Sequence, residues 1–122
     1  MKPETLLLRQ VHPSFVQNGQ ITSQVFRPTP KDEDKLSVYN GDMITPADSF
    51  AHFINTPNCQ SVGVVAITCN DCKNQSLDVI ADGKPFPEHA YIDFSGLEKN
   101  AIEKKAKIMK RCAQDRGWLF QA

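Results

Sequence analysis

Ser-Val-Gly-Val-Val-Ala-Ile-Thr at residues 61–68 is the clearest strand signal in this sequence. The run is continuously apolar and rich in β-branched residues, which fit the pleated surface of a sheet. Because it shows no polar alternation, it predicts a strand inside a sheet with both of its faces covered. The remaining chain must therefore supply neighbouring strands and the layers that cover them.

Weaker strand signals lie on both sides of this run. They are short apolar or alternating segments at residues 5–12, 36–39, 77–80 and 89–94. Pro13 ends the first of them, because proline cannot donate to a sheet ladder. Residues 17–20 contain Asn18-Gly19, a common two-residue hairpin turn, and residues 21–27 are compatible with a short strand or an irregular segment.

Two helices are predicted from their start signals. Thr45 is an N-cap, with Pro46 at the first helical position and Asp48 at the third, and Phe50, Phe53 and Ile54 form the apolar face. The second helix covers about residues 96–116. Ser95 and Glu98 form a predicted capping box, and Gly117 is the expected stop. A helical apolar stripe supports it, formed by Ala101, Ile102, Ala106, Met109, Cys112 and Ala113.

The order of these elements is three strands, a helix, three strands and a helix. Short hairpin-like connections predict one α+β domain over residues 1–122, with a mixed or mainly antiparallel sheet of about five to six strands. Two helices cover it, and the C-terminal one is long and basic. We expect Trp118, Leu119 and Phe120 to fold back onto this body.

The charge of the chain is balanced in total but not along its length. The 122 residues hold 14 Lys plus Arg and 14 Asp plus Glu, and 40% of them are hydrophobic, which excludes a disordered chain. A net charge of zero argues against a generic polyanion binder. Residues 97–116, however, carry seven basic and three acidic side chains, so a net +4 there balances −4 on residues 1–96.

The compartment is expected to be the cytoplasm. No stretch approaches the roughly 18 apolar residues of a membrane span, and the N-terminal apolar run is too short for a signal peptide. The four cysteines are then reduced thiols. Cys69 and Cys72 form a C-x-x-C, but no second ligand pair accompanies it, so we expect a polar loop at residues 69–75 and no metal or other cofactor.

Candidate catalytic residues gather in two parts of the chain. They are His12, Ser23, Arg27, Ser37 and His89. His12 is a candidate base, Ser23 or Ser37 a nucleophile or positioning hydroxyl, and Arg27 or Arg9 an anion holder. His89, Tyr91 and Asp93 share one face of a predicted strand. The competing interpretations are turn hydroxyls that bond nearby backbone and the solvated face of an edge strand.

Candidate partner-binding residues lie on the basic C-terminal helix. They are Lys104, Lys107, Lys110, Arg111 and Trp118. Basic side chains on one helix face suit an acidic protein partner, or nucleic acid bound along residues 99–118 with Trp118 stacking on a base. The competing interpretation is a solvated face whose cations interact with the negative end of the helix dipole.

Four motifs resemble a family of small uncharacterised bacterial proteins. They are His12-Pro13-Ser14-Phe15-Val16-Gln17-x-Gly19, Thr22-Ser23-Gln24-x-Phe26-Arg27-Pro28-Thr29-Pro30-Lys31-Asp32, Leu36-Ser37-Val38-Tyr39, and Pro85-Phe86-Pro87-Glu88-His89-Ala90-x-Ile92-Asp93-Phe94. The resemblance covers residues 6–94 and implies a stand-alone bacterial domain with a common fold, but no reaction. The strand pattern is also loosely similar to ADP-ribosyltransferase-like toxins, by analogy of pattern alone.

Three functions remain open on the sequence. The first is a small cytoplasmic interaction or regulatory module, such as an accessory, antitoxin or immunity-like protein. The second is a small enzyme or toxin that acts on a nucleotide or nucleic acid. The third is nucleic-acid binding through the basic helix. A protein partner is expected in the first, and no membrane in any of them.

Overall fold

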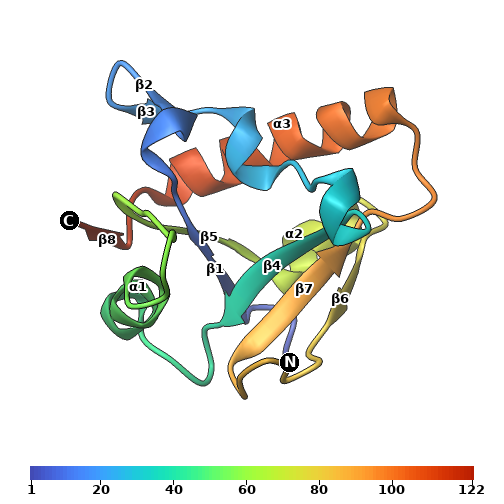
Figure 1. The fold of residues 1–122 in the computed structure, drawn as a ribbon. Coiled ribbons are helices and arrows are strands. Elements are labelled where there is room, and N and C mark those ends of the chain that lie inside the picture. The colour runs from blue at the N-terminus through green and yellow to red at the C-terminus, as the bar shows by residue number, and fades with distance from the viewer.

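The structure, a computed structural model that describes residues 1–122, is built on a six-stranded sheet. Its strands are β1 (Leu6–Gln10), β4 (Lys35–Asn40), β5 (Gly63–Thr68), β6 (Asp78–Ile80), β7 (His89–Asp93) and β8 (Phe120–Gln121). They run antiparallel to their neighbours in the order β6-β7-β4-β1-β5-β8 (Figure 1). The two ends of the chain thus contribute strands to one sheet.

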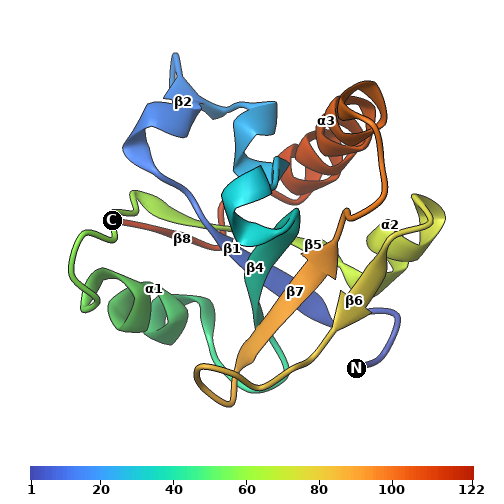
Figure 2. The same ribbon diagram turned by 45° about the vertical axis from the view of Figure 1, so that its right-hand side comes forward.

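Three α-helices cover the two faces of the sheet. They are α1 (Pro46–Ile54), α2 (Cys69–Asn74) and α3 (Lys99–Arg116). α1 lies on one face, and α2 and α3 lie on the other (Figure 2). The α+β class, the antiparallel sheet of six strands and the long C-terminal helix are confirmed, and α2 is a third helix that the sequence reading did not contain.

The remaining short elements connect β1 to β4. They are the 3-10 helices η1 (Pro13–Phe15), η2 (Ser23–Phe26) and η3 (Pro30–Asp32), with the hairpin β2 (Val16–Gln17) and β3 (Gln20–Ile21) between the first two. The hairpin prediction is confirmed, since Asn18 and Gly19 both have positive φ, as its turn requires. Residues 21–27, for which a short strand or an irregular segment was expected, contain the 3-10 helix η2. The first predicted strand ends at Gln10 rather than at residue 12.

The predicted strand at residues 61–68 is β5, which pairs with β1 on one side and β8 on the other. Both of its faces are covered, as expected. Val65 and Ile67 belong to the larger core beneath α3, whereas Val64 and Ala66 belong to the smaller core beneath α1. All four are at most 2% exposed, which explains the absence of polar alternation in this run.

The start of α1 is confirmed. The Thr45 hydroxyl accepts from the amide of Asp48 at 3.1 Å, and Pro46 occupies the first turn. One apolar assignment was wrong. Phe50 and Phe53 pack against the smaller core, but Ile54 is 46% exposed because it lies at the final position of the helix, beyond the sheet.

The predicted capping box at Ser95 and Glu98 was wrong. The side chain of Asp93 accepts from the Ser95 amide at 2.9 Å, which forms a local turn, and Gly96 continues it with a φ of +79°. α3 therefore begins three residues later than expected, at Lys99. Glu98 is its N-cap and makes no side-chain capping bond.

The prediction of a polar loop at residues 69–75 was also wrong. Thr68 and Asp71 form a reciprocal capping box, with 3.0 Å and 2.9 Å bonds, that starts the short helix α2 directly after β5. Cys72 is its single fully buried residue and packs into the larger core. A single apolar residue gives no helical periodicity, so the pattern did not reveal the helix.

No helix in the structure has both the length and the apolar character needed to cross a membrane.

Candidate functional site

Two of the five candidate catalytic residues come together on the face of the sheet that α1 covers. The Nε2 atom of His89 lies 3.2 Å from Oγ of Ser37, and the Nδ1 atom of the same ring lies 2.6 Å from Oδ1 of Asp82. Serine, histidine and carboxylate are therefore joined in one chain of hydrogen bonds. In this order the carboxylate orients the ring, and the ring can accept the serine proton.

The register of the sheet creates this contact. In the β4–β7 pair, Tyr39 stands opposite His89 and Ser37 stands opposite Tyr91, so Ser37 and His89 are diagonal neighbours on one face. Asp82 reaches the ring because the following loop turns back on itself. Gly83 has a φ of +62° and its amide donates to the carbonyl of His89 at 3.2 Å.

The carboxylate of Asp82 is held in its ionised form. Partial burial raises its pKa, but the hydrogen bond and charge of His89 and the amides of Lys84 and Asp82 itself lower it by more, so the net pKa lies below its usual value. The side chains of His89 and Asp82 are 13% and 30% exposed, so the pair is accessible but not fully solvated.

A cavity of about 470 Å³ opens beside Ser37 and His89, and we call it the aromatic cavity. Its rings come from α1, β4 and the loop before β7, namely His52, Phe53, Tyr39 and Phe86. Phe86 stacks on Tyr39 with ring centroids 5.1 Å apart and meets the rings of His52 and His89 at steep angles. This volume and lining are typical of a small-molecule site.

Arg9 is the one Lys, Arg, Asp or Glu residue that lines the aromatic cavity. Its Nε donates to the carbonyl of Val25 at 2.8 Å and its Nη1 to the carbonyl of Ser37 at 3.0 Å. Only two of its five N–H donors are used, and no carboxylate lies within 4 Å of it. Burial lowers its pKa to about 10, and the charge of Asp32 opposes that shift. The Arg9 guanidinium is thus held in place with free N–H donors that can bind an anion.

Tyr39 and His52, which also line the aromatic cavity, form a second polar pair. The Tyr39 hydroxyl lies 2.8 Å from Nδ1 of His52. Burial raises the pKa of Tyr39 to about 12, and the neighbouring Cys59 and Glu88 add to the effect. The hydroxyl therefore stays protonated at neutral pH and acts as a hydrogen-bonding group rather than as a charge.

The other candidate catalytic residues lie elsewhere. His12 is exposed at the start of η1, where its Nδ1 contacts Oγ of Ser14 at 2.7 Å and accepts from the Ser14 amide. Ser23 accepts from Nη2 of Arg27 at 3.2 Å, and none of the three lines the aromatic cavity. Arg9, the alternative to Arg27 as the predicted anion-binding residue, lines the cavity instead.

The row His89, Tyr91 and Asp93 does share one face of β7, as predicted, but its members have different contacts. Lys35 lies over the ring of Tyr91, 5.1 Å from its centroid, and Asp93 accepts from the Ser95 amide. These two residues are therefore engaged at the edge of the site. Only His89 reaches Ser37.

The four cysteines are all free thiols. Cys72 is buried, and burial raises its pKa to about 12, with the neighbouring Cys69 and Asp71 adding to the shift. Burial also raises the pKa of Cys69. A redox pair needs a lowered thiol pKa, so this C-x-x-C lacks the property on which such chemistry depends. No group of three or more His, Cys, Asp or Glu is arranged to hold a metal ion.

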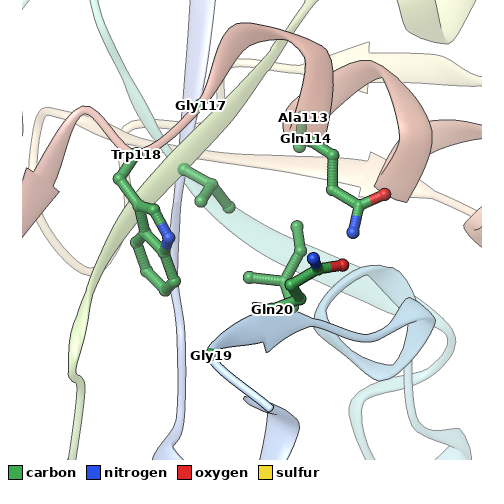
Figure 3. A pocket seen from close by; sticks show the side chains of 8 residues that line it. Gly19, Gln20, Ala113, Gln114, Gly117 and Trp118 are labelled. Atoms are coloured by element: carbon green, nitrogen blue, oxygen red, sulfur yellow. The ribbon is translucent and has the colours of Figure 1, made fainter. Parts of the chain in front are cut away.

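Four of the five candidate partner-binding residues line two adjoining cavities on the α3 side of the sheet. Lys107, Lys110 and Arg111 border a cavity of about 570 Å³ between α3 and the β2–β3 hairpin. Trp118 borders an adjoining cavity of about 390 Å³ (Figure 3). Lys104 is exposed on the same helix but lines neither cavity.

Comparison with protein-family models, curated proteins and solved structures finds no match. The site therefore has to be interpreted from its own geometry. Ser37 and His89 were predicted from the sequence, whereas Asp82, Tyr39, His52 and Phe86 were not. One signal for Asp82 was available, because a carboxylate seven residues before His89 precedes a proline-containing loop that must turn back toward the strand.

Proposed function

We propose that this protein is a small enzyme that acts on a nucleotide by transfer of a phosphoryl group through Ser37. The observation that carries the proposal is the hydrogen-bonded chain Ser37–His89–Asp82, whose Ser37 and His89 line the aromatic cavity. A serine hydroxyl is a weak nucleophile until a base removes its proton. A histidine within hydrogen-bond reach, oriented by a carboxylate, meets that requirement.

The cavity supports the choice of substrate class. Phe86, which stacks on the buried ring of Tyr39, offers a flat apolar surface for a planar base, and the polar pair Tyr39–His52 can hydrogen-bond its edge. Arg9 supplies an unpaired guanidinium beside Ser37, and guanidinium groups bind phosphate through two parallel hydrogen bonds. Base and phosphate thus each have a complementary wall.

The side chains at the site can account for each bond change and proton transfer of the proposed reaction. Oγ of Ser37 forms a bond to phosphorus while the bond between phosphorus and the leaving oxygen breaks. His89 takes the hydroxyl proton at Nε2 and donates it to the leaving oxygen, and Arg9 stabilises the charge on the phosphoryl oxygens. Water then attacks the phosphorus of the phosphoserine ester while the bond between phosphorus and Oγ breaks. His89 takes a proton from the water and returns it to Oγ, so that inorganic phosphate leaves and the serine hydroxyl is restored.

A fluorophosphonate probe tests this proposal, because it reacts covalently with activated serines through phosphorus. We expect one adduct by intact mass, located on Ser37 by peptide mapping, and absent in Ser37→Ala. His89→Ala is expected to slow labelling about a hundredfold or more, because the base is removed, and Asp82→Asn to slow it less. A nucleoside monophosphate should be hydrolysed to the nucleoside and inorganic phosphate, and phosphate release should be slowed by the variants in the same order.

The chain provides a matched control. Ser14 and His12 form a second Ser–His contact at 2.7 Å, but it is exposed, has no carboxylate and lines no part of the cavity. Ser14→Ala should therefore leave labelling and hydrolysis unchanged. Labelling that is spread over several serines, or equal in Ser37→Ala, would contradict the proposal.

We also propose that the protein works in the cytoplasm, where its four free thiols would remain reduced. The hypothesis of a protein-binding module depends on the basic helix and stays a prediction.

A further inference from the structure

The hollows beside α3 form one continuous groove, which we call the helix groove. The cavity of about 570 Å³ and the cavity of about 390 Å³ share Gln20, Ile21 and Gln114 as lining residues. One wall is the C-terminal half of α3, and the other is the β2–β3 hairpin (Figure 1). From Lys107 to Gly117 the wall extends about 15 Å at 1.5 Å per helical residue.

One end of the helix groove is strongly positive. Lys107, Lys110 and Arg111 line it, and no carboxylate does. None of the three cations has an acidic partner within 4 Å, since the three ion pairs of the molecule involve other residues. Interaction with the helix dipole alone would not require these cations to border one concave surface.

The other end of the groove holds an indole in a fixed position. Trp118 packs its six-membered ring so closely on β5 that a Cβ placed on Gly63 would lie 2.8 Å from it. The indole therefore cannot settle deeper into the protein, and it remains partly exposed at the groove. Figure 3 shows its side chain on one side of the cavity, with Gln20 and Gln114 on the other.

Four amide side chains line the helix groove beside the cations, and two of them, Gln20 and Gln114, also line the cavity that Trp118 borders. The lining includes Gln17, Asn18, Gln20 and Gln114. None of these side chains has a hydrogen-bond partner within the protein. Each carries both donors and an acceptor, so together they can bond the edges of different bases.

We infer that the helix groove binds single-stranded nucleic acid, with the backbone along Lys107, Lys110 and Arg111 and a base stacked on Trp118. Aligned cations and an aromatic platform are the two features that sequence-tolerant single-strand sites combine. A duplex would not expose its base faces to the indole. The groove lies on the α3 side of the sheet and the aromatic cavity on the α1 side, so this inference is independent of the chemistry at Ser37.

Fluorescence anisotropy with a labelled deoxythymidine oligonucleotide tests the inference on the full chain. We expect binding at low salt, with log affinity falling against log salt at a slope of about −2 for three phosphate contacts. The double variant Lys107→Glu with Arg111→Glu should weaken binding on the order of a hundredfold or more. Trp118→Ala should weaken it about tenfold through lost stacking, and Trp118→Phe should restore most of that loss.

The control is Lys73→Glu with Lys99→Glu, which makes the same change in net charge at two exposed residues outside the groove. Compared with the wild type at physiological salt, it should bind within about twofold, because Lys99 lies about 12 Å from Lys107 along the helix and the Debye length there is about 8 Å. Circular dichroism confirms that each variant is folded. An equal loss in the control, tighter binding of duplex than of single strand, or preferential binding of polyglutamate would each overturn the inference, as would no binding at low salt.

Discussion

Single side chains decide which of two similar contacts can perform chemistry. His12–Ser14 and His89–Ser37 both join an imidazole to a serine hydroxyl. Only His89 has a carboxylate on its second nitrogen, and only its serine borders a cavity with an unpaired arginine. The difference lies in the surroundings of each pair and not in the residue types, so the local sequence could not rank them.

Tyr39 gives a prediction at the residue scale. Burial raises its pKa from 10.0 to about 12, so ultraviolet titration of Tyr91→Phe, where Tyr39 is the remaining tyrosine, should show tyrosinate forming with a midpoint near 12. Between about pH 10 and 12 the folded chain then binds more protons than the unfolded chain. This contribution to stability is therefore fully present below pH 10 and is lost as the pH rises through 12.

The same titration has a clear opposite outcome. A midpoint at 10 would mean that the Tyr39 hydroxyl is freely solvated, and the wall formed with Phe86 and His52 would then be absent. Denaturant unfolding of Tyr39→Phe should show a smaller alkaline decline of stability between pH 10 and 12 than the wild type, and the decline that remains comes from other raised groups such as Cys72.

At the scale of elements, capping bonds determine where helices begin. Thr45 and Thr68 each accept from the amide three residues later, and α1 and α2 start directly after them. In contrast, the Ser95–Glu98 motif fits the same pattern but is not used. There the Ser95 amide donates to the carboxylate of Asp93, which forms a local turn before the helix instead of a capping box.

The cap of α2 gives a prediction at this scale. Thr68→Ala removes the acceptor for the Asp71 amide, so the free energy of unfolding should fall by about 1 kcal/mol in urea denaturation. Thr56→Ala is the matched control, because its exposed hydroxyl makes no hydrogen bond within the protein and its loss should cost almost nothing. Equal stabilities of the two variants would mean that this cap does not hold the helix.

At the scale of the whole molecule, the sheet separates two candidate sites. The aromatic cavity lies beneath α1 and the helix groove lies beside α3. The C-terminal segment is fixed on the sheet, since β8 pairs with β5 and Trp118 packs on Gly63. Although the net charge of the chain is zero, the molecule has a positive groove on one side of a less basic body. The net charge alone therefore does not describe how the molecule interacts with a charged ligand.

Gly63 gives a prediction at this largest scale. In Gly63→Ala the new methyl group would meet the ring of Trp118 at 2.8 Å and the carbonyl of Phe120, so β8 and the indole must move outward. We expect a loss of about 1 to 3 kcal/mol in stability from overpacking, and a shift of Trp118 fluorescence to longer wavelength. Wild-type stability with an unchanged emission maximum would show that the C-terminal strand adapts without strain.

Local patterns were sufficient for most of the elements. The β-branched run at residues 61–68, the alternation in β7, the Asn18-Gly19 turn and the Thr45-Pro46 start all identified their elements, because strand period, turn conformation and capping depend on near neighbours. The short helix α2 and the exact start of α3 escaped, because each is set by one or two side-chain bonds that carry no period.

By itself the sequence determined the fold class, five of the six strands of the sheet and two members of the candidate site, Ser37 and His89, while the strand β8 was expected only as a segment that folds back onto the body. Only the tertiary structure decided that Asp82 joins them, that Arg9 rather than Arg27 is beside them, and that His12 is not. The physical reason is that the alternation of buried and exposed positions within one element is visible as a local pattern of apolar and polar residues. Which side chains share a cavity depends instead on strand register and loop path, which arise from contacts far apart in sequence.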